Sequence, residues 1–127
     1  MVTTILDHRD DLQIVGARVY SEDKSGVDIG TLVGRDAIGV PATTDVEAIL
    51  ALDAECVLYT PRTARVDDAC ALLASGKNIA TTAFMFHPQR MDPADRERVL
   101  AACEVGGSSV HGSGLNPGNL SGVLPLA

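Results

Sequence analysis

The sequence predicts an α/β fold in which a parallel sheet is built from strands joined by crossover helices. Short apolar runs of strand length alternate along the chain with segments whose apolar residues recur at helical spacing. Glycine or proline separates most of these segments, as expected at turns. With 127 residues, of which 46% are hydrophobic, the chain is large and apolar enough to bury a core.

The first half of the chain is expected to alternate between helices and strands. In order, the segments are the end of a helix at 2–10, a strand at 12–19, a short helix at 29–33 and a short edge strand at 40–43. Pro41 is compatible with an edge strand, because proline cannot donate to the ladder of a central one. Thr44 and Glu47 have the spacing of a capping box, which predicts a helix that begins after Thr44.

The second half repeats the alternation with clearer boundaries. The expected segments are a strand at 56–59, a helix at 66–73, a strand at 78–82, a helix at 93–105 and a strand at 108–111. The run at 56–59 is continuously apolar, so we expect it to be buried on both faces. Asp92 suits an N-cap and Pro93 the first helical position, while Gly76 and the glycine pair at 106–107 suit helix ends.

Composition and charge exclude several classes of function. A net charge of −7 disfavours binding to nucleic-acid backbones and anionic membranes, which need clustered lysine and arginine. No apolar run approaches the roughly 20 residues of a membrane span, and the N-terminus lacks the features of a signal peptide, so a cytoplasmic location is expected. Cys56, Cys70 and Cys103 have no metal-binding spacing, and we expect three buried free thiols and no metal site.

Polar or glycine-rich residues follow four of the predicted strands. They are Tyr20 and Ser21, Thr60 and Pro61, the segment 81–83, and the segment 111–118. Because the carboxyl ends of parallel strands meet at one edge of a sheet, these residues are expected to line a common rim. The sequence therefore predicts a binding crevice at this edge.

Four stretches of the chain resemble a known family. The segments 11–20, 53–61, 77–84 and 111–118, the last containing Gly-Leu-Asn-Pro-Gly, are similar to the nucleotide-binding half of dihydrodipicolinate reductase-like oxidoreductases and the related 2,4-diaminopentanoate dehydrogenases. The resemblance implies a Rossmann-like dinucleotide-binding domain at 1–118, with helices on both faces of the sheet. It implies that 119–127 begin a helix leading to a substrate domain. It further implies NADP or NAD as cofactor and an amino-acid-derived small molecule as substrate, reacting at a C=N bond or an amine-bearing carbon.

The same resemblance implies roles for individual residues. Tyr20, Ser21 and Lys24 would meet the adenosine ribose, where Ser21 and Lys24 suit the 2′-phosphate of NADP and Glu22 suits the ribose hydroxyls of NAD. The sequence leans slightly towards NADP. The nicotinamide side would be met by Thr60, Pro61, Thr81, Thr82 and Ala83, and the substrate side by His111, Gly114 and Asn116. For the two threonines at 81–82, ordinary strand packing is the alternative, and for His111 a structural role.

The chain also departs from the pattern of that family. No strand with a Gly-x-Gly-x-x-Gly turn precedes Leu12, and no substrate domain follows. We therefore expect an internal piece of an oxidoreductase that is inactive alone, with no catalytic residue of its own. Without the first strand, the strands at 12–19 and 56–59 lose a shared neighbour, which favours pairing with each other or with a second copy. A non-catalytic α/β module that binds a ligand or a partner is the alternative function.

Overall fold

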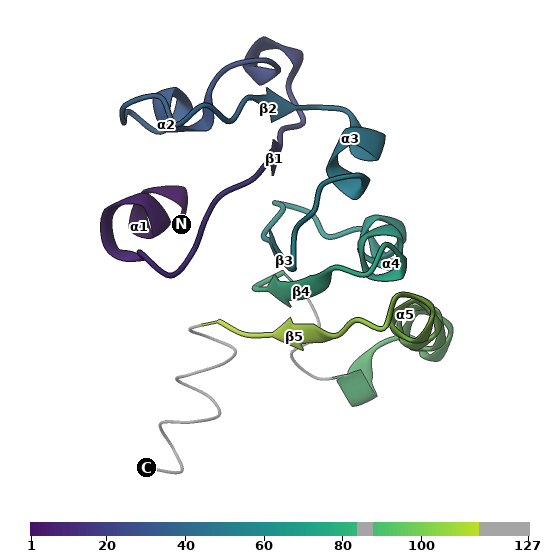
Figure 1. Ribbon diagram of the computed structural model, residues 1–127. Coiled ribbons are helices and arrows are strands. Elements are labelled where there is room, and N and C mark those ends of the chain that lie inside the picture. The colour runs from purple at the N-terminus through teal and green to yellow at the C-terminus, as the bar shows by residue number, and fades with distance from the viewer. Residues whose placement is uncertain (84–87, 115–127) are drawn as a thin grey trace, which may run out of the picture. The chain divides into compact units, whose positions relative to one another are not determined.

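The computed structural model describes residues 1–83 and 88–114 and confirms the predicted α/β class. Five short strands alternate with helices among the described residues, and every strand pair is parallel (Figure 1). The chain divides into two compact units, Met1–Asp53 and Ala54–Ala127. Each unit has its own sheet.

Unit 1 is a small assembly of short elements. In order, these are α1 (Val2–His8), β1 (Ala17–Arg18), the 3-10 helix η1 (Glu22–Lys24), α2 (Ile29–Leu32), β2 (Ala42–Thr43) and α3 (Val46–Leu50). Strand β1 pairs with β2 in a two-stranded parallel sheet, with Ala17 opposite Ala42. Its buried apolar residues are Ile29, Ala42 and Ile49.

One carboxylate organises the loop that joins α2 to β2. Asp28 caps α2, and its Oδ1 accepts the backbone N–H of Gly30 at 2.8 Å and that of Ile38 at 3.0 Å. Its Oδ2 accepts the N–H of Val40 at 2.9 Å. These backbone donors, Ile38 first, hold the pKa of Asp28 below its ordinary value. A single side chain therefore satisfies donors that lie up to twelve residues away.

Two sequence predictions for unit 1 were wrong in detail. The strand expected at 12–19 covers only Ala17–Arg18, because its partner β2 is also two residues long and offers no further ladder. The N-cap of α3 is Asp45 rather than Thr44, since the Asp45 carboxylate accepts the N–H of Glu47 at 2.9 Å. Both residue types cap helices well, so sequence alone did not separate the two neighbours.

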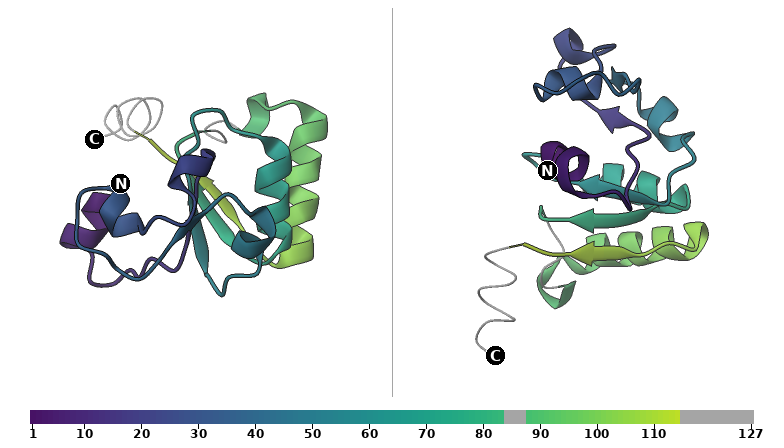
Figure 2. Two further views of the ribbon diagram at one scale, coloured as in Figure 1. Left: turned by 90° about the horizontal axis from the view of Figure 1, so that it is seen from above. Right: turned by 60° about the vertical axis from the view of Figure 1, so that its left-hand side comes forward.

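Unit 2 contains a three-stranded parallel sheet in the order β3-β4-β5. Its elements are β3 (Cys56–Tyr59), α4 (Val66–Ala74), β4 (Asn78–Thr81), the 3-10 helix η2 (Pro88–Arg90), α5 (Pro93–Gly106) and β5 (Val110–Gly112). Helices α4 and α5 lie side by side over one face of the sheet (Figure 2). The core between them holds Ala69, Leu73, Ile79 and Val99, all nearly inaccessible to solvent.

Asn78 ties the amino ends of the three strands together. Its Nδ2 donates to the carbonyl of Glu55 at 3.1 Å, beside β3. Its Oδ1 accepts the backbone N–H of Ser109 at 3.0 Å and the Ser109 hydroxyl at 2.9 Å, just before β5. The strand predicted at 108–111 begins at Val110 because Ser109 is engaged in this way. Asn78 thus fixes the strand register from one end.

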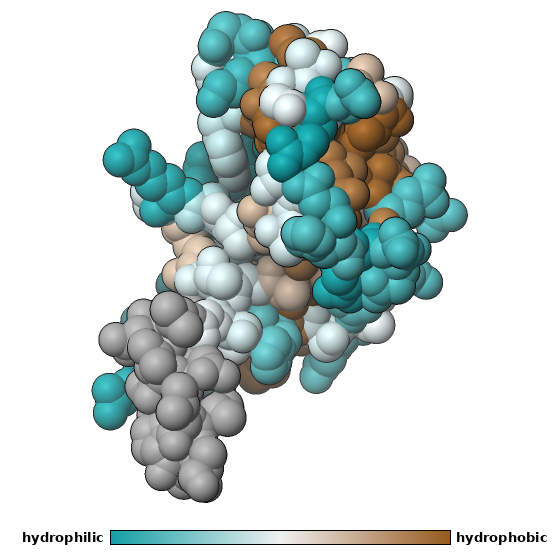
Figure 3. All heavy atoms as spheres, turned by 90° about the vertical axis from the view of Figure 1, so that its left-hand side faces the viewer, coloured by the Kyte–Doolittle hydropathy of each residue, from teal (hydrophilic) through white to brown (hydrophobic). Residues whose placement is uncertain are grey.

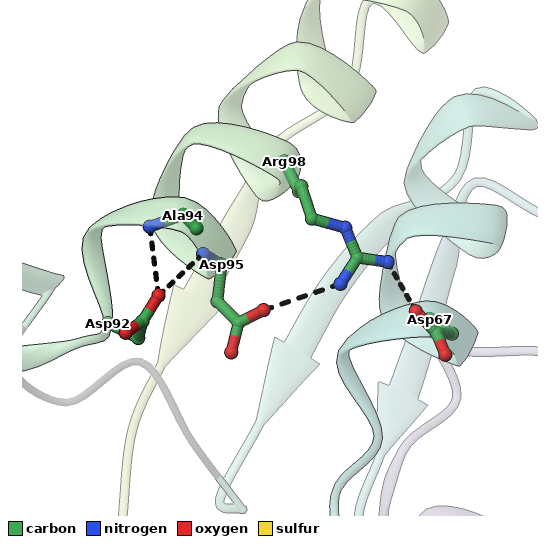
Figure 4. A network of polar contacts seen from close by, with 5 residues as sticks. All are labelled: Asp67, Asp92, Ala94, Asp95 and Arg98. Carbon is green, nitrogen blue, oxygen red and sulfur yellow. Dashed lines mark hydrogen bonds and ion pairs between the residues drawn. The ribbon is translucent and has the colours of Figure 1, made fainter.

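Helix α5 begins as predicted, and α4 begins at the predicted Val66 but ends at Ala74 with Ser75 as its C-cap in place of the predicted Gly76. Asp92 caps α5 through the N–H groups of Ala94 at 2.9 Å and Asp95 at 3.3 Å, with Pro93 at the first helical position (Figure 4). Helix α5 ends at Gly106, and its C-cap Gly107 is left-handed with a φ of 61°. The two helices approach so closely that a Cβ on Gly106 would lie 1.9 Å from the carbonyl oxygen of Leu73.

The predicted burial of β3 and of the cysteines was wrong. Cys56 is exposed and Leu58 is 42% exposed, whereas Tyr59 is buried, because strand residues alternate between faces and α4 and α5 cover one face. Cys70 and Cys103 are half-buried, and burial raises the pKa of the Cys70 thiol. All three thiols are free, as expected.

On the face drawn in Figure 3, hydrophilic side chains predominate, and apolar side chains gather mainly in the upper right of the view. No helix in the described ranges is both long and apolar enough to cross a membrane.

Candidate functional site

The carboxyl ends of β3, β4 and β5 form one edge of the unit 2 sheet. Because Tyr59, Thr81 and Gly112 are register partners in parallel strands, the residues that follow each of them lie at the same edge. A backbone hydrogen bond of 2.8 Å from Ser113 to Thr81 extends the pairing past the end of β5. The structure thus brings together the predicted site residues of unit 2 from three strands: Thr60, Pro61, Thr81, Thr82, Ala83 and Gly114.

The two threonines at the end of β4 differ in exposure. Thr81 is 2% exposed, and its hydroxyl oxygen accepts the N–H of Ala83 at 3.0 Å, which shapes the turn after the strand. Thr82 is exposed and Ala83 is half-buried. Strand packing therefore accounts for Thr81, while Thr82 and Ala83 are the residues that present small side chains at the edge.

A buried tyrosine holds the loop that follows β3. Tyr59 is 5% exposed, and its hydroxyl accepts the backbone N–H of Arg65 at 3.0 Å and donates to the Arg65 carbonyl at 3.2 Å. Between these residues, Thr60 is exposed and Pro61 is half-buried. The loop at 60–65 is closed by two hydrogen bonds at its far end, which limits its conformational freedom.

Exposed arginines follow both β3 and β4, and the sequence pattern did not single them out. Arg62 and Arg65 are both exposed, and Arg90 ends η2 in the connection that follows β4. The sequence does contain a sign of them, because two arginines directly after a predicted strand stand out in a chain of net charge −7.

The substrate-side residues are only partly described. His111 lies within β5, is exposed and is the register partner of Ala80, so it sits one residue before the edge. Gly114 is half-buried at the edge. Asn116 and the rest of the segment 115–127 lie outside the described residues, as does the helix expected at 119–127.

The predicted adenosine-side residues belong to unit 1. Tyr20 follows β1 and is 63% exposed, and the guanidinium carbon of Arg18 lies 4.9 Å from its ring centroid. The Ser21 hydroxyl donates to the Asp23 carboxylate and thereby lowers the pKa of Asp23. Lys24 ends η1 and is exposed. A 2′-phosphate at Ser21 would therefore compete with a carboxylate that already holds the hydroxyl.

Unit 1 also contains a pocket of about 270 Å³ that the sequence did not predict. Its lining is mainly apolar and comprises Val15, Gly16, Ala17, Gly39, Val40, Pro41, Thr43, Ala48, Ile49 and Leu52. It contains none of the predicted site residues. Among the residues that the structure describes, no group of three histidine, cysteine, aspartate or glutamate side chains is placed to hold a metal ion.

Comparison with known proteins gives one informative similarity. No protein-family model matches the chain. An amine dehydrogenase of Streptomyces virginiae is 36% identical in an alignment of 123 positions, which covers 91% of this chain and 34% of that protein. The chain thus spans about a third of the length of the curated relative it matches. This similarity relates the chain to a dehydrogenase-type oxidoreductase.

Proposed function

We propose that this chain is a dinucleotide-binding part of an NAD(P)-dependent oxidoreductase that acts on an amine-bearing carbon or a C=N bond. The observation that carries the proposal is the common edge formed by Thr60, Thr82 and Gly114 at the ends of three parallel strands. Ligands of open α/β sheets bind outside the carboxyl ends of the strands. The similarity to an amine dehydrogenase supports the reaction class.

The residues at this edge fit the nicotinamide half of such a cofactor. Ala83 and Gly114 have little or no side chain, so a flat ring can approach the backbone closely. The exposed hydroxyls of Thr60 and Thr82 offer polar contacts for a ribose or a carboxamide. When bound, the nicotinamide supplies hydride transfer. The residues of this chain would position it and exclude water from one side.

In unit 1, the contact of Tyr20, Ser21 and Lys24 with an adenosine ribose stays a prediction from the sequence. Lys24 favours a 2′-phosphate, whereas the engagement of Ser21 by Asp23 opposes it. Both NADPH and NADH therefore belong in the test. The proposed substrate is a small amine. The match covers about a third of the relative's length, and we propose that the regions of the relative outside the match supply the rest of the substrate-binding site.

Cofactor binding can be tested on the chain by nuclear magnetic resonance. We expect NADPH or NADH to shift the backbone amides of Thr60, Thr82, Ala83 and Gly114, and AMP to leave these four nearly unchanged, because it lacks both the nicotinamide and the ribose attached to it. Ala83→Leu should weaken this binding about tenfold or more by filling the edge. Ala101→Leu is the matched control, since it places the same side chain on an exposed position of α5. Dinucleotides that leave all four amides unmoved would refute the proposal.

The reaction class can be tested with a chimaera. In it, this chain replaces the aligned third of the Streptomyces virginiae protein, which is assayed in parallel. We expect the chimaera to reduce NAD⁺ or NADP⁺ in the presence of an amine. Ala83→Leu should abolish most of this activity, whereas Ala101→Leu should retain it. A folded chimaera without activity, beside an active parent, would favour the non-catalytic alternative.

A further inference from the structure

Tyr59 joins the end of β3 to the start of α4 through its side chain. Its hydroxyl accepts the backbone N–H of Arg65 at 3.0 Å and donates to the Arg65 carbonyl at 3.2 Å. Arg65 is the N-cap residue of α4, and within the described residues its own side chain forms no capping hydrogen bond. The Arg65 carbonyl also accepts the N–H of Ala69 at 3.2 Å, in the first turn of the helix. One phenol therefore fixes the far end of the loop at 60–65.

The Tyr59 side chain is itself held firmly. It is 5% exposed, on the face of the sheet that α4 and α5 cover. Its register partner in β4 is Thr81, which is 2% exposed and whose carbonyl accepts the N–H of Ser113 at 2.8 Å. Hydrogen bonds in such a buried setting are stronger than those exposed to water. The phenol is thus a rigid support for the loop.

The supported loop carries residues of the candidate site. Thr60 is exposed and Pro61 is half-buried, and both follow directly after Tyr59. The pyrrolidine ring of Pro61 fixes its φ, so the start of the loop is restricted as well. A loop that is already ordered loses less conformational entropy when a ligand binds.

We propose that Tyr59 is a positioning residue of the dinucleotide site, which acts on the cofactor through the loop at 60–65. The inference rests on the proposed function, in which Thr60 offers its hydroxyl to the nicotinamide half. The Tyr59 hydroxyl is bonded to the backbone of Arg65, so its effect reaches Thr60 through the loop. The loop is then ordered during folding and not during binding, which strengthens binding of the dinucleotide.

Tyr59→Phe tests this role, because it keeps the buried ring and removes both bonds to Arg65. In the free chain we expect faster amide exchange at Arg65. In titrations with NADH and NADPH, followed by the amides of Thr82 and Ala83, we expect a Kd about fivefold to tenfold higher than that of the unaltered chain. The two amides should still shift at saturation, since they lie outside the loop.

Ser108→Ala is the matched control for the loss of a hydroxyl. The Ser108 hydroxyl donates to the carbonyl of Leu73 at 2.8 Å, and Ser108 precedes β5, so this bond lies in unit 2 away from the candidate site. We expect this variant to leave the dinucleotide Kd and the exchange at Arg65 unchanged.

Kinetics of the chimaera separate positioning from a general loss of stability. A loop that must be ordered on binding weakens the ground state and the transition state equally, so Tyr59→Phe should raise the KM for NAD⁺ or NADP⁺ about fivefold to tenfold and change kcat by less than about twofold. Loss of folded protein would instead lower kcat at an unchanged KM, and that result would count against the inference.

Two other results would overturn it. Unchanged amide exchange at Arg65 in Tyr59→Phe would show that the hydroxyl does not hold the loop. Faster exchange with an unchanged Kd would show that the loop does not contribute to binding, while the proposed function stands. An unaltered chain whose amides respond to neither dinucleotide would refute the proposed function together with this inference, so the two failures are distinguishable.

Discussion

At the scale of single residues, Asp28 holds together the loop between α2 and β2 in unit 1. Its carboxylate joins the start of α2 to Ile38 and Val40 on the far side of the loop. Asp28→Asn removes the charge and one acceptor oxygen, so the backbone donors of this loop lose part of their partners. We expect a lower urea midpoint for unit 1 and faster amide exchange at Ile38 and Val40. Asp36→Asn, which removes an exposed acid from the same loop, should leave both measurements unchanged.

The same residue predicts how acid affects unit 1. The folded state lowers the pKa of Asp28 from its ordinary value of 3.8. Its contribution is therefore fully present above that ordinary value and is lost as the pH falls through the lower folded value. Urea unfolding of unit 1, followed by its amide signals, should show this loss below about pH 4. In Asp28→Asn the acid-dependent part should be smaller, and an unchanged pH profile would contradict the assignment.

At the scale of elements, the contact between α4 and α5 depends on one glycine. Replacing a helical glycine with alanine ordinarily stabilises by up to about 1 kcal/mol. In Gly106→Ala, however, the new Cβ would lie 1.9 Å from the Leu73 carbonyl oxygen, so the helices must move apart. We expect a net loss of about 1–3 kcal/mol, the usual cost of overpacking. Chemical denaturation measures it, with Val105→Ala on the exposed side of α5 as the control; a stabilised Gly106→Ala would show that the helices separate freely.

Local signals explain which elements could be predicted from the sequence. Asp92, Pro93 and Gly107 define the ends of α5 through short-range bonds, and all three were assigned correctly. The prediction of Thr44 as the cap of α3 was wrong because its neighbour Asp45, which caps the helix, is a residue of similar capping ability. The length of β1 was predicted wrongly for another reason, because the length of a strand depends on the partner strand with which it pairs.

At the scale of the whole molecule, the sequence predicted the fold class but not the pattern of burial. The parallel pairing of β3, β4 and β5 follows from the alternation of elements, and so does the edge shared by Thr60, Thr82 and Gly114. The exposure of Cys56 and Leu58 was not predictable from an apolar run, because burial is decided by which layers cover each face. The role of Tyr59 in holding the loop was not predictable either, because its hydroxyl bonds the backbone of Arg65, six residues along the chain.

The hydrogen bonds of Asn78 align the strands of unit 2 at one end of the sheet, away from the candidate site. All of these bonds lie at the amino ends of the strands, whereas the candidate site lies at the carboxyl ends. Loops at the site can therefore be lengthened, shortened or exchanged while the strands stay aligned. The same sheet can accept new substrate preferences by loop replacement, and libraries for engineering would best randomise 60–65 and 82–83 and leave Asn78 untouched.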